Sequence, residues 1–235
     1  MTDNFYFAEG RPFAGRELDR LKAFLKDRGL DYDDKITYTA CIIDENTGDI
    51  AATGSMSGII LKCVAVSQNY HGQGLLNDLM SRLYETMYNK GSVHFVGFTK
   101  PDNLGVFSHM GLYPVVSTEH IVFLENRKDE FKKYLSKLRE RSVKGGDMSV
   151  GNDTGAGVDL SDDAGDKAGT RLYIEEMDKC KEAGSPDQVS FPGYLIPPEQ
   201  MPTYFIKDKD KALQYRQEVF DRVKYEIQRA IGICD

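Results

Sequence analysis

One short stretch constrains the fold of this chain more than any other: residues 64–76, "VAVSQNYHGQGLL". An apolar run ends there, two glycines follow with one residue between them, and an apolar helix pattern begins. Glycine allows left-handed backbone conformations and close approach of a ligand to the main chain. The free N–H groups and the dipole of a helix N-terminus attract anions. The stretch therefore predicts a strand, a loop and a helix, with the loop serving either as a plain turn or as a phosphate site.

The elements around this stretch follow from hydrophobic periodicity and turn residues. A helix is expected over 15–29, with Leu18, Leu21, Phe24 and Leu25 on one face and Gly29 as its stop. Further helices are expected over 74–91, 104–111 and 127–141. Runs rich in β-branched and aromatic residues predict strands over 35–43, 49–58, 58–66, 92–99 and 117–125. This order predicts an α+β fold.

Composition changes abruptly near residue 143. Residues 143–170 are mainly glycine, aspartate and serine, which cannot bury enough apolar surface to offset chain entropy, so they predict a flexible linker. We therefore expect a first domain over 1–142, a linker over 143–170, and a mostly helical tail over 171–235. The last helix is expected from about Asp208, and its apolar face comprises Leu213, Phe220, Val223, Ile227 and Ile231. This helix is expected to dock on the first domain or on a partner.

Bulk composition excludes several classes of function. The formal net charge is −7, so no overall basic field attracts nucleic acid or an anionic membrane. No apolar run approaches the roughly 20 residues that span a bilayer, and residues 1–13 do not read as a signal peptide. The cysteines at 41, 63, 180 and 234 show no metal-ligand spacing. We expect reduced thiols, no metal site and a cytoplasmic protein.

The glycine loop matches neither of two common phosphate motifs. A Rossmann fingerprint needs a third glycine, and a P-loop needs Gly-Lys-Ser/Thr. "VAVSQNYHGQGLLNDLM" instead resembles the strand–loop–helix of GNAT-type acetyltransferases, and "FSHMGLYP" resembles their second motif. The resemblance implies a mixed, twisted sheet flanked by helices, in which the strands 62–66 and 92–98 diverge and acetyl-CoA or CoA lies between them. It implies cofactor-binding roles for Val64, Val66, His71, Gly72, Gln73, Gly74, Leu75, Leu76 and Asn103.

Three positions depart from the GNAT pattern. His71 replaces the usual Arg or Gln, and Leu76 replaces Gly or Ala. Phe107 stands where many of these enzymes carry a tyrosine that protonates the leaving thiolate, and a phenyl ring cannot donate a proton. His94 is the candidate catalytic base; the alternative is a packed or surface histidine. The residues therefore support CoA binding better than catalysis of acetyl transfer.

A more specific resemblance covers residues 15–142. "GIILKCVAVSQNYHGQGLLNDLM", "FTKPDNLGVFSHMGLYPV" and "FLENRKDEFKKYLSKL" resemble the N-terminal domain of the citrate lyase ligase family, and residues 194–233 resemble a fragment of its nucleotidyltransferase domain. The family uses ATP to activate acetate and then acetylates the thiol of a CoA-like prosthetic group. That group belongs to the acyl carrier subunit of citrate lyase, which is the implied partner.

The adenylation chemistry of that family needs a His-x-Gly-His motif, which this sequence lacks. ATP is therefore expected as a cofactor only if the missing domain is supplied elsewhere. Three hypotheses follow: a citrate lyase ligase-like protein whose intact part binds CoA, a stand-alone N-acetyltransferase, and a non-catalytic interaction module.

Overall fold

The computed structural model describes residues 4–10, 13–145, 193–202 and 208–234. It divides into two compact units, each assembled from two stretches of chain. The first comprises Met1–Lys128 with Ile196–Val219, and the second comprises Asp129–Leu195 with Phe220–Asp235. Apart from residues 143–145, the predicted linker over 143–170 lies outside the described residues, as does the start of the predicted tail.

The first unit is built on one seven-stranded sheet with the order β1-β2-β3-β4-β5-β7-β6. Its strands are β1 (Phe5–Gly10), β2 (Tyr38–Asp44), β3 (Ile50–Ser57), β4 (Ile60–Val66), β5 (Val96–Thr99), β6 (Tyr113–Ser117) and β7 (Val122–Glu125). Strands β1 to β4 pair antiparallel, β4 and β5 pair parallel, and β7 pairs antiparallel with both β5 and β6. The predicted α+β class with a mixed sheet is confirmed.

Strands β4 and β5 stay together over a very short distance. Their ladder consists of Ile60 opposite Val96 and Leu61 opposite Gly97, whereas β4 continues to Val66 and β5 to Thr99. Beyond this point the two strands diverge. The divergence predicted from the acetyltransferase resemblance is confirmed.

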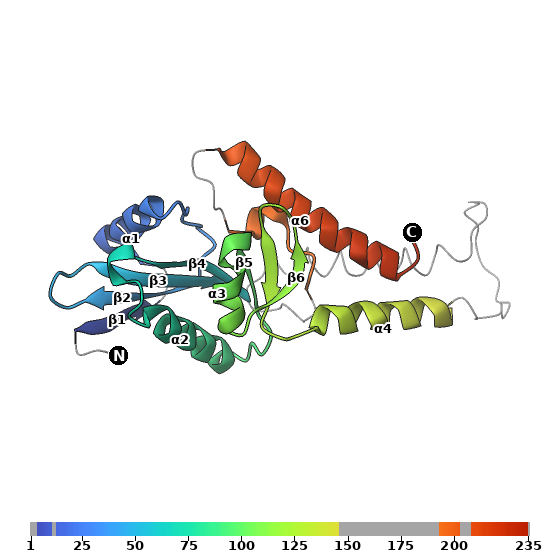
Figure 1. Cartoon of the computed structure of the whole chain (residues 1–235), viewed down its shortest axis with the longest axis horizontal. Helices are drawn as coiled ribbons and strands as arrows, with labels where there is room; N and C mark the ends of the chain where they lie inside the picture. Colours follow the sequence, from blue (N-terminus) through green and yellow to red (C-terminus); the bar gives the residue numbers. More distant parts are fainter. Residues whose placement is uncertain (1–3, 11–12, 146–192, 203–207, 235) are drawn as a thin grey trace, which may run out of the picture. The chain divides into compact units, whose positions relative to one another are not determined.

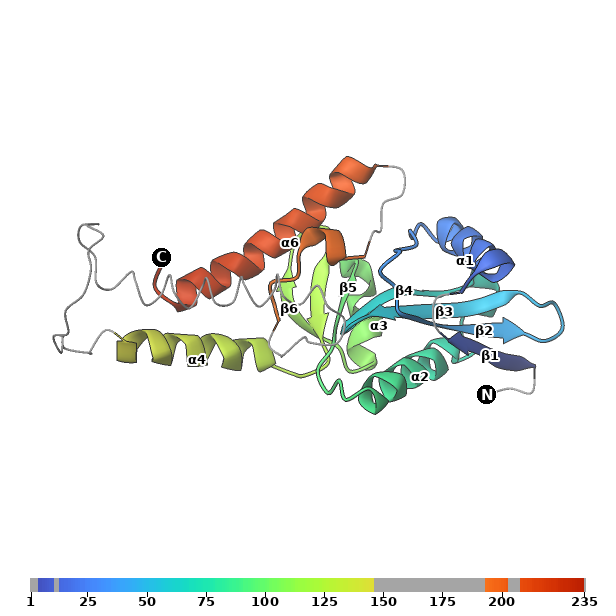
Figure 2. The same ribbon diagram turned by 180° about the vertical axis from the view of Figure 1, so that it is seen from behind.

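Helices cover both faces of the sheet. Figures 1 and 2 show α1 (Gly15–Asp27) on one face of the first four strands and α2 (Leu75–Asn89) on the other. Leu21 and Leu25 of α1 pack with Ile36, Cys41 and Cys63 on their side. The buried side of α2 consists of Leu75, Leu79, Met80, Leu83 and Met87. These are positions that the 3.6-residue period placed on the apolar face.

Short elements connect the later strands. The 3-10 turns η1 (Gln68–Tyr70) and η2 (Pro101–Asn103) precede α2 and α3 (Leu104–His109), respectively. Gly111 follows α3 with a φ of 80°, a left-handed value that ends the helix, as its position in the sequence predicted. Strands β1 and β6 were not among the expected strands.

The second unit includes α4 (Glu130–Gly145), in which Phe131, Tyr134, Leu135 and Leu138 are buried. The ring centroid of Tyr194 lies 4.6 Å from that of Phe131 and 5.3 Å from that of Tyr134. The rings of Phe131, Tyr134 and Tyr194 thus pack together.

The helix α6 (Lys209–Ala230) contributes residues to both units, and the turn η3 (Pro198–Gln200) belongs to the first. Val223, Ile227 and Ile231 are buried, as expected. Leu213 and Phe220 were expected on the same face, but Leu213 is 49% exposed and Phe220 is half-buried, and their neighbours Ala212 and Val219 are buried instead. A phase error of one residue in this part of the helix explains the difference, because one step turns the helix by about 100°.

None of the described helices is long and apolar enough to cross a membrane. Within the same residues, no group of three or more His, Cys, Asp or Glu side chains is placed to hold a metal ion.

Candidate functional site: a cavity between diverging strands

A cavity of about 570 Å³ lies in the first unit where β4 and β5 diverge. Residues 61–66 line one side and residues 97–100 line the other, while the loop and first turn leading into α2 contribute residues 70–72 and 74–77. Its volume falls within the range of small-molecule and cofactor sites. The site is therefore built from backbone that sheet pairing leaves free.

A bulge in β4 shapes this side of the cavity. Thr53 pairs with Ala65 and Ser55 pairs with Lys62, so one residue of β3 opposes two of β4. Cys63, within the bulge, has a φ of 53°, which is rare for a residue with a side chain. Bulges interrupt the hydrogen-bond ladder and redirect the strand. The bulge explains how β4 turns away from β5 while keeping its pairing with β3.

The loop before α2 presents unpaired amides. Gly72 and Gly74 both have a φ of 79°, and Gly74 is the N-cap of the helix. The amides of Asn77 and Asp78 donate to the carbonyl of Gly74, at 2.9 and 3.3 Å. The N–H groups of residues 72–76 donate to no acceptor in the described part of the chain. This main chain is suited to an anion, as the opening motif suggested.

The structure brings most of the predicted cofactor residues together. Val64, Val66, His71, Gly72, Gly74, Leu75, Leu76 and Asn103 all line the cavity. Gln73 does not; its side chain is exposed. Binding by these residues stays a prediction, but their convergence on one cavity supports it.

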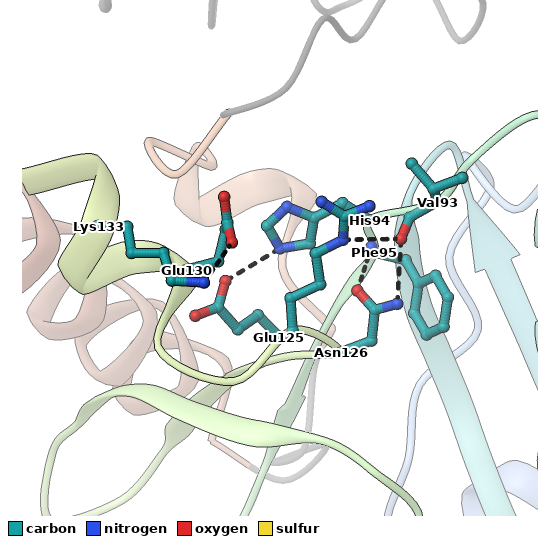
Figure 3. A network of polar contacts seen from close by, with 8 residues as sticks. Val93, His94, Phe95, Glu125, Asn126, Glu130 and Lys133 are labelled. Carbon is teal, nitrogen blue, oxygen red and sulfur yellow. Dashed lines mark hydrogen bonds and ion pairs between the residues drawn. The ribbon is translucent and has the colours of Figure 1, made fainter. Parts of the chain in front are cut away.

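The predicted catalytic histidine lies elsewhere. His94 precedes β5 by two residues and is buried, and its Nε2 lies 3.0 Å from Oε2 of the buried Glu125 (Figure 3). Beside it, the Asn126 side chain binds the Phe95 amide at 2.9 Å and the Val93 carbonyl at 3.3 Å. His94 does not line the cavity. The geometry matches the alternative weighed from the sequence, a packed histidine.

The cavity is cationic. Arg28, Lys62 and Lys100 line it, and no aspartate or glutamate is among its lining residues, although the chain carries a net charge of −7. Lys62 is buried and forms an ion pair with Asp33. Burial lowers the pKa of Lys62, while the Asp33 carboxylate opposes that shift. Arg28 and Lys62 were not predicted as site residues because they lie outside the glycine motif. The only available signal was for Lys62, a charged residue within the apolar run of a predicted strand.

Two further lining residues restrict the chemistry. Phe107 presents a ring with no proton to give. The Cys63 thiol packs with Leu21 and Leu25, and its Sγ lies 3.5 Å from the Asp31 carbonyl. Burial raises the pKa of Cys63 to about 12, so the thiol stays protonated near neutral pH and is a poor nucleophile.

Comparisons with known proteins identify relatives of part of the chain. No family model matches. The citrate (pro-3S)-lyase ligase of Haemophilus influenzae is 28% identical over 131 residues, which is 55% of this chain and 39% of that protein. The ligase of Klebsiella pneumoniae is 31% identical over 98 residues, or 41% of this chain and 29% of that protein. The similarity thus covers about half of this chain and well under half of each relative.

Two solved structures align with about half of this chain. An acyl-CoA N-acyltransferase from Pseudomonas aeruginosa aligns over 52% of this chain and 99% of its own, with 14% identity and a TM-score of 0.45. The structure titled NatC complex bound to Gag peptide and CoA aligns over 52% of this chain and 96% of its own, with 13% identity and a TM-score of 0.42.

Proposed function

We propose that the first unit binds CoA, acetyl-CoA or a CoA-like prosthetic arm in the cavity between β4 and β5. The pantetheine chain lies along the backbone of Val64 and Val66, and the diphosphate lies on the amides of residues 72–76. The observation that carries the proposal is a cofactor-sized cavity that joins unpaired main-chain amides to a lining with cations and no carboxylates. Such a lining suits an anionic ligand.

The charges of the cavity lining also bear on which molecule could accept an acyl group. Transfer to an amine requires a base, and an amine that binds as a cation favours nearby carboxylates. The cavity offers neither a carboxylate nor the predicted His94. An N-acetyltransferase acting on a cationic amine therefore fits this site less well than a protein that handles a CoA-type thiol.

The relatives suggest which CoA-type ligand the protein binds. Similarity to citrate lyase ligases supports a ligase-like role whose ligand is the CoA-like prosthetic group of the citrate lyase acyl carrier subunit. In this proposal ATP takes part only if an adenylating domain is supplied elsewhere. The protein acts in the cytoplasm, in keeping with the free cysteines Cys41, Cys63 and Cys234.

A thermal shift panel on the full chain tests the proposal. CoA, acetyl-CoA and ATP are added separately, because a ligand that binds the folded state raises the melting temperature with its occupancy. We expect CoA and acetyl-CoA to stabilise the chain and ATP to have no effect. Stabilisation by ATP alone would contradict the assignment of the cavity, and release of free CoA with simple amines would favour an N-acetyltransferase.

The variant Asn77→Glu tests whether the CoA-induced stabilisation comes from this cavity. Asn77 is exposed, lies in the first turn of α2 and lines the cavity, so a glutamate there is compatible with the helix but repels a diphosphate. Ser81→Glu, one turn further along the same helix and outside the lining, is the matched control. We expect the CoA-induced shift to fall in the first variant and to remain in the second. Equal shifts in both would place CoA elsewhere.

A further inference from the structure

Arg28 is a cavity residue that no sequence motif identified. It caps the C-terminal end of α1 and lines the cavity. Its Nη2 lies 3.3 Å from Ser67 Oγ and 3.2 Å from Asp27 Oδ2, and its guanidinium carbon lies 5.4 Å from the centroid of Phe24. Its Nε is buried and has no hydrogen-bond partner in the described part of the chain.

These contacts use only part of the hydrogen-bonding capacity of the Arg28 side chain. A guanidinium carries five N–H donors in a fixed planar arrangement, and both polar contacts seen here use Nη2. A buried donor without a partner costs free energy unless a ligand or water satisfies it. Phosphate oxygens match the spacing of adjacent guanidinium donors and bind them in pairs. The unpaired Nε therefore leaves Arg28 with a donor that an anion could use.

Ser67 fixes Arg28 next to the phosphate loop. The Ser67 amide donates to the Ala51 carbonyl at 2.8 Å, which anchors it to β3, and its carbonyl accepts from the Tyr70 amide at 3.0 Å. Ser67 thus lies at the point where β4 passes into the loop that carries the free amides. The guanidinium bound to its hydroxyl is held at that end of the cavity.

Two other side chains of the cavity, Lys62 and His71, are less suited to this role. The Lys62 side chain has no exposed surface and is paired with Asp33. His71 has its Nε2 at 3.3 Å from the Val66 carbonyl, which turns the ring toward the strand. Arg28 retains 22% side-chain exposure, so an incoming ligand reaches it without breaking an ion pair in the interior.

We propose that Arg28 binds the diphosphate of the CoA-type ligand and supplies the side-chain charge that the glycine loop lacks. The inference rests on the proposed function and extends it to a specificity residue: ligands with a diphosphate are preferred over those without one. The loop amides orient the diphosphate, and Arg28 neutralises it from the α1 side.

Isothermal titration of the full chain with CoA and with dephospho-CoA tests the proposal. Both ligands carry the diphosphate, and only CoA carries the 3′-phosphate. We expect Arg28→Gln to weaken both about tenfold to a hundredfold, and Arg28→Lys to weaken them less. Arg16→Gln, at an exposed position of the same helix outside the cavity, is expected to match the wild type. Pantetheine at millimolar concentration, which has no diphosphate, is expected to raise the melting temperatures of wild type and Arg28→Gln equally.

The outcomes separate the two proposals. If the wild type binds neither ligand, the proposed function fails. If the wild type binds and Arg28→Gln binds as tightly, Arg28 is not a ligand residue and only this inference is overturned. A loss confined to CoA would assign Arg28 to the 3′-phosphate and also overturn the diphosphate assignment. If Arg28→Gln does not fold, Arg28→Lys decides: its affinity must fall for both ligands, and an unchanged affinity overturns the inference.

Discussion

At the scale of single residues, Lys62 is the most unusual side chain near the site. It interrupts the apolar run of β4, its side chain has no exposed surface, and Asp33, which pairs with it, is 21% exposed. Moving a charge out of water is costly, and the ion pair recovers part of that cost. Burial outweighs the pair in its effect on the pKa of Lys62, which is lowered. Keeping Lys62 protonated in the interior therefore lowers the stability of the folded state.

This cost predicts a pH dependence. Because the pKa of Lys62 is lower in the folded state, the unfolded chain binds more protons between that value and 10.5, so its contribution to stability rises with pH in this window. Relative to Lys62→Met, the wild type is expected to gain stability toward pH 10, by at most about 1.4 kcal/mol per pH unit. Urea unfolding between pH 7 and 10 measures the difference.

Lys26→Met, at an exposed position of α1, controls for removal of a charge. Its stability relative to the wild type is expected to change little over the same pH range. A Lys62→Met difference that stays constant from pH 7 to 10 would show that burial does not perturb this lysine.

At the scale of elements, the packing of α2 on β3 positions the amide loop. Gly54 lies opposite the β4 bulge, and a Cβ added there would come within 2.6 Å of Leu83 Cδ1 on α2. Leu83 is itself fully buried, so it has little freedom to move. The small residue lets the helix approach the sheet at the place where the strand bulges.

Gly54→Ala is therefore expected to destabilise the fold by about 1–3 kcal/mol through overpacking. The matched variant Gly97→Ala lies on β5, where an added Cβ meets Leu61 Cβ at 3.7 Å, an ordinary contact. Its effect is expected to stay within about 0.5 kcal/mol. Urea denaturation of both variants provides the comparison, and equal free energies of unfolding would argue against close packing at Gly54.

Most elements could be predicted from the sequence, and the exceptions have local causes. Leu21, Leu25, Leu79 and Leu83 recur with helical spacing, which made α1 and α2 recognisable. Strand β6 contains Pro114, a residue that argues against a strand and is tolerated near a sheet edge, and β6 is an edge strand. Strand β1 is the opposite edge of the sheet; it has six residues and a weak alternation of burial.

At the scale of the whole molecule, the candidate site was predictable only in part. The residues of the glycine loop are contiguous, so a motif revealed them. Lys62 lies on β4, directly before the loop, whereas Arg28 lies at the end of α1, far from the loop in sequence, and tertiary packing brings it to the cavity. The surroundings of His94 were not foreseen because β5 begins at Val96, four residues later than the expected start at 92, and the His94 ring pairs with Glu125 of β7.

The central claim is that a chain with a net charge of −7 keeps a cationic cavity for a CoA-type ligand between two diverging strands. Nuclear magnetic resonance of the ¹⁵N-labelled full chain, titrated with CoA, tests it most directly. The account predicts saturable shifts of the amide signals of residues 72–76 and 64–66, with the signals of β1, three strands away, unchanged. Loop signals that do not move at saturating CoA, or shifts centred on β1, would contradict it.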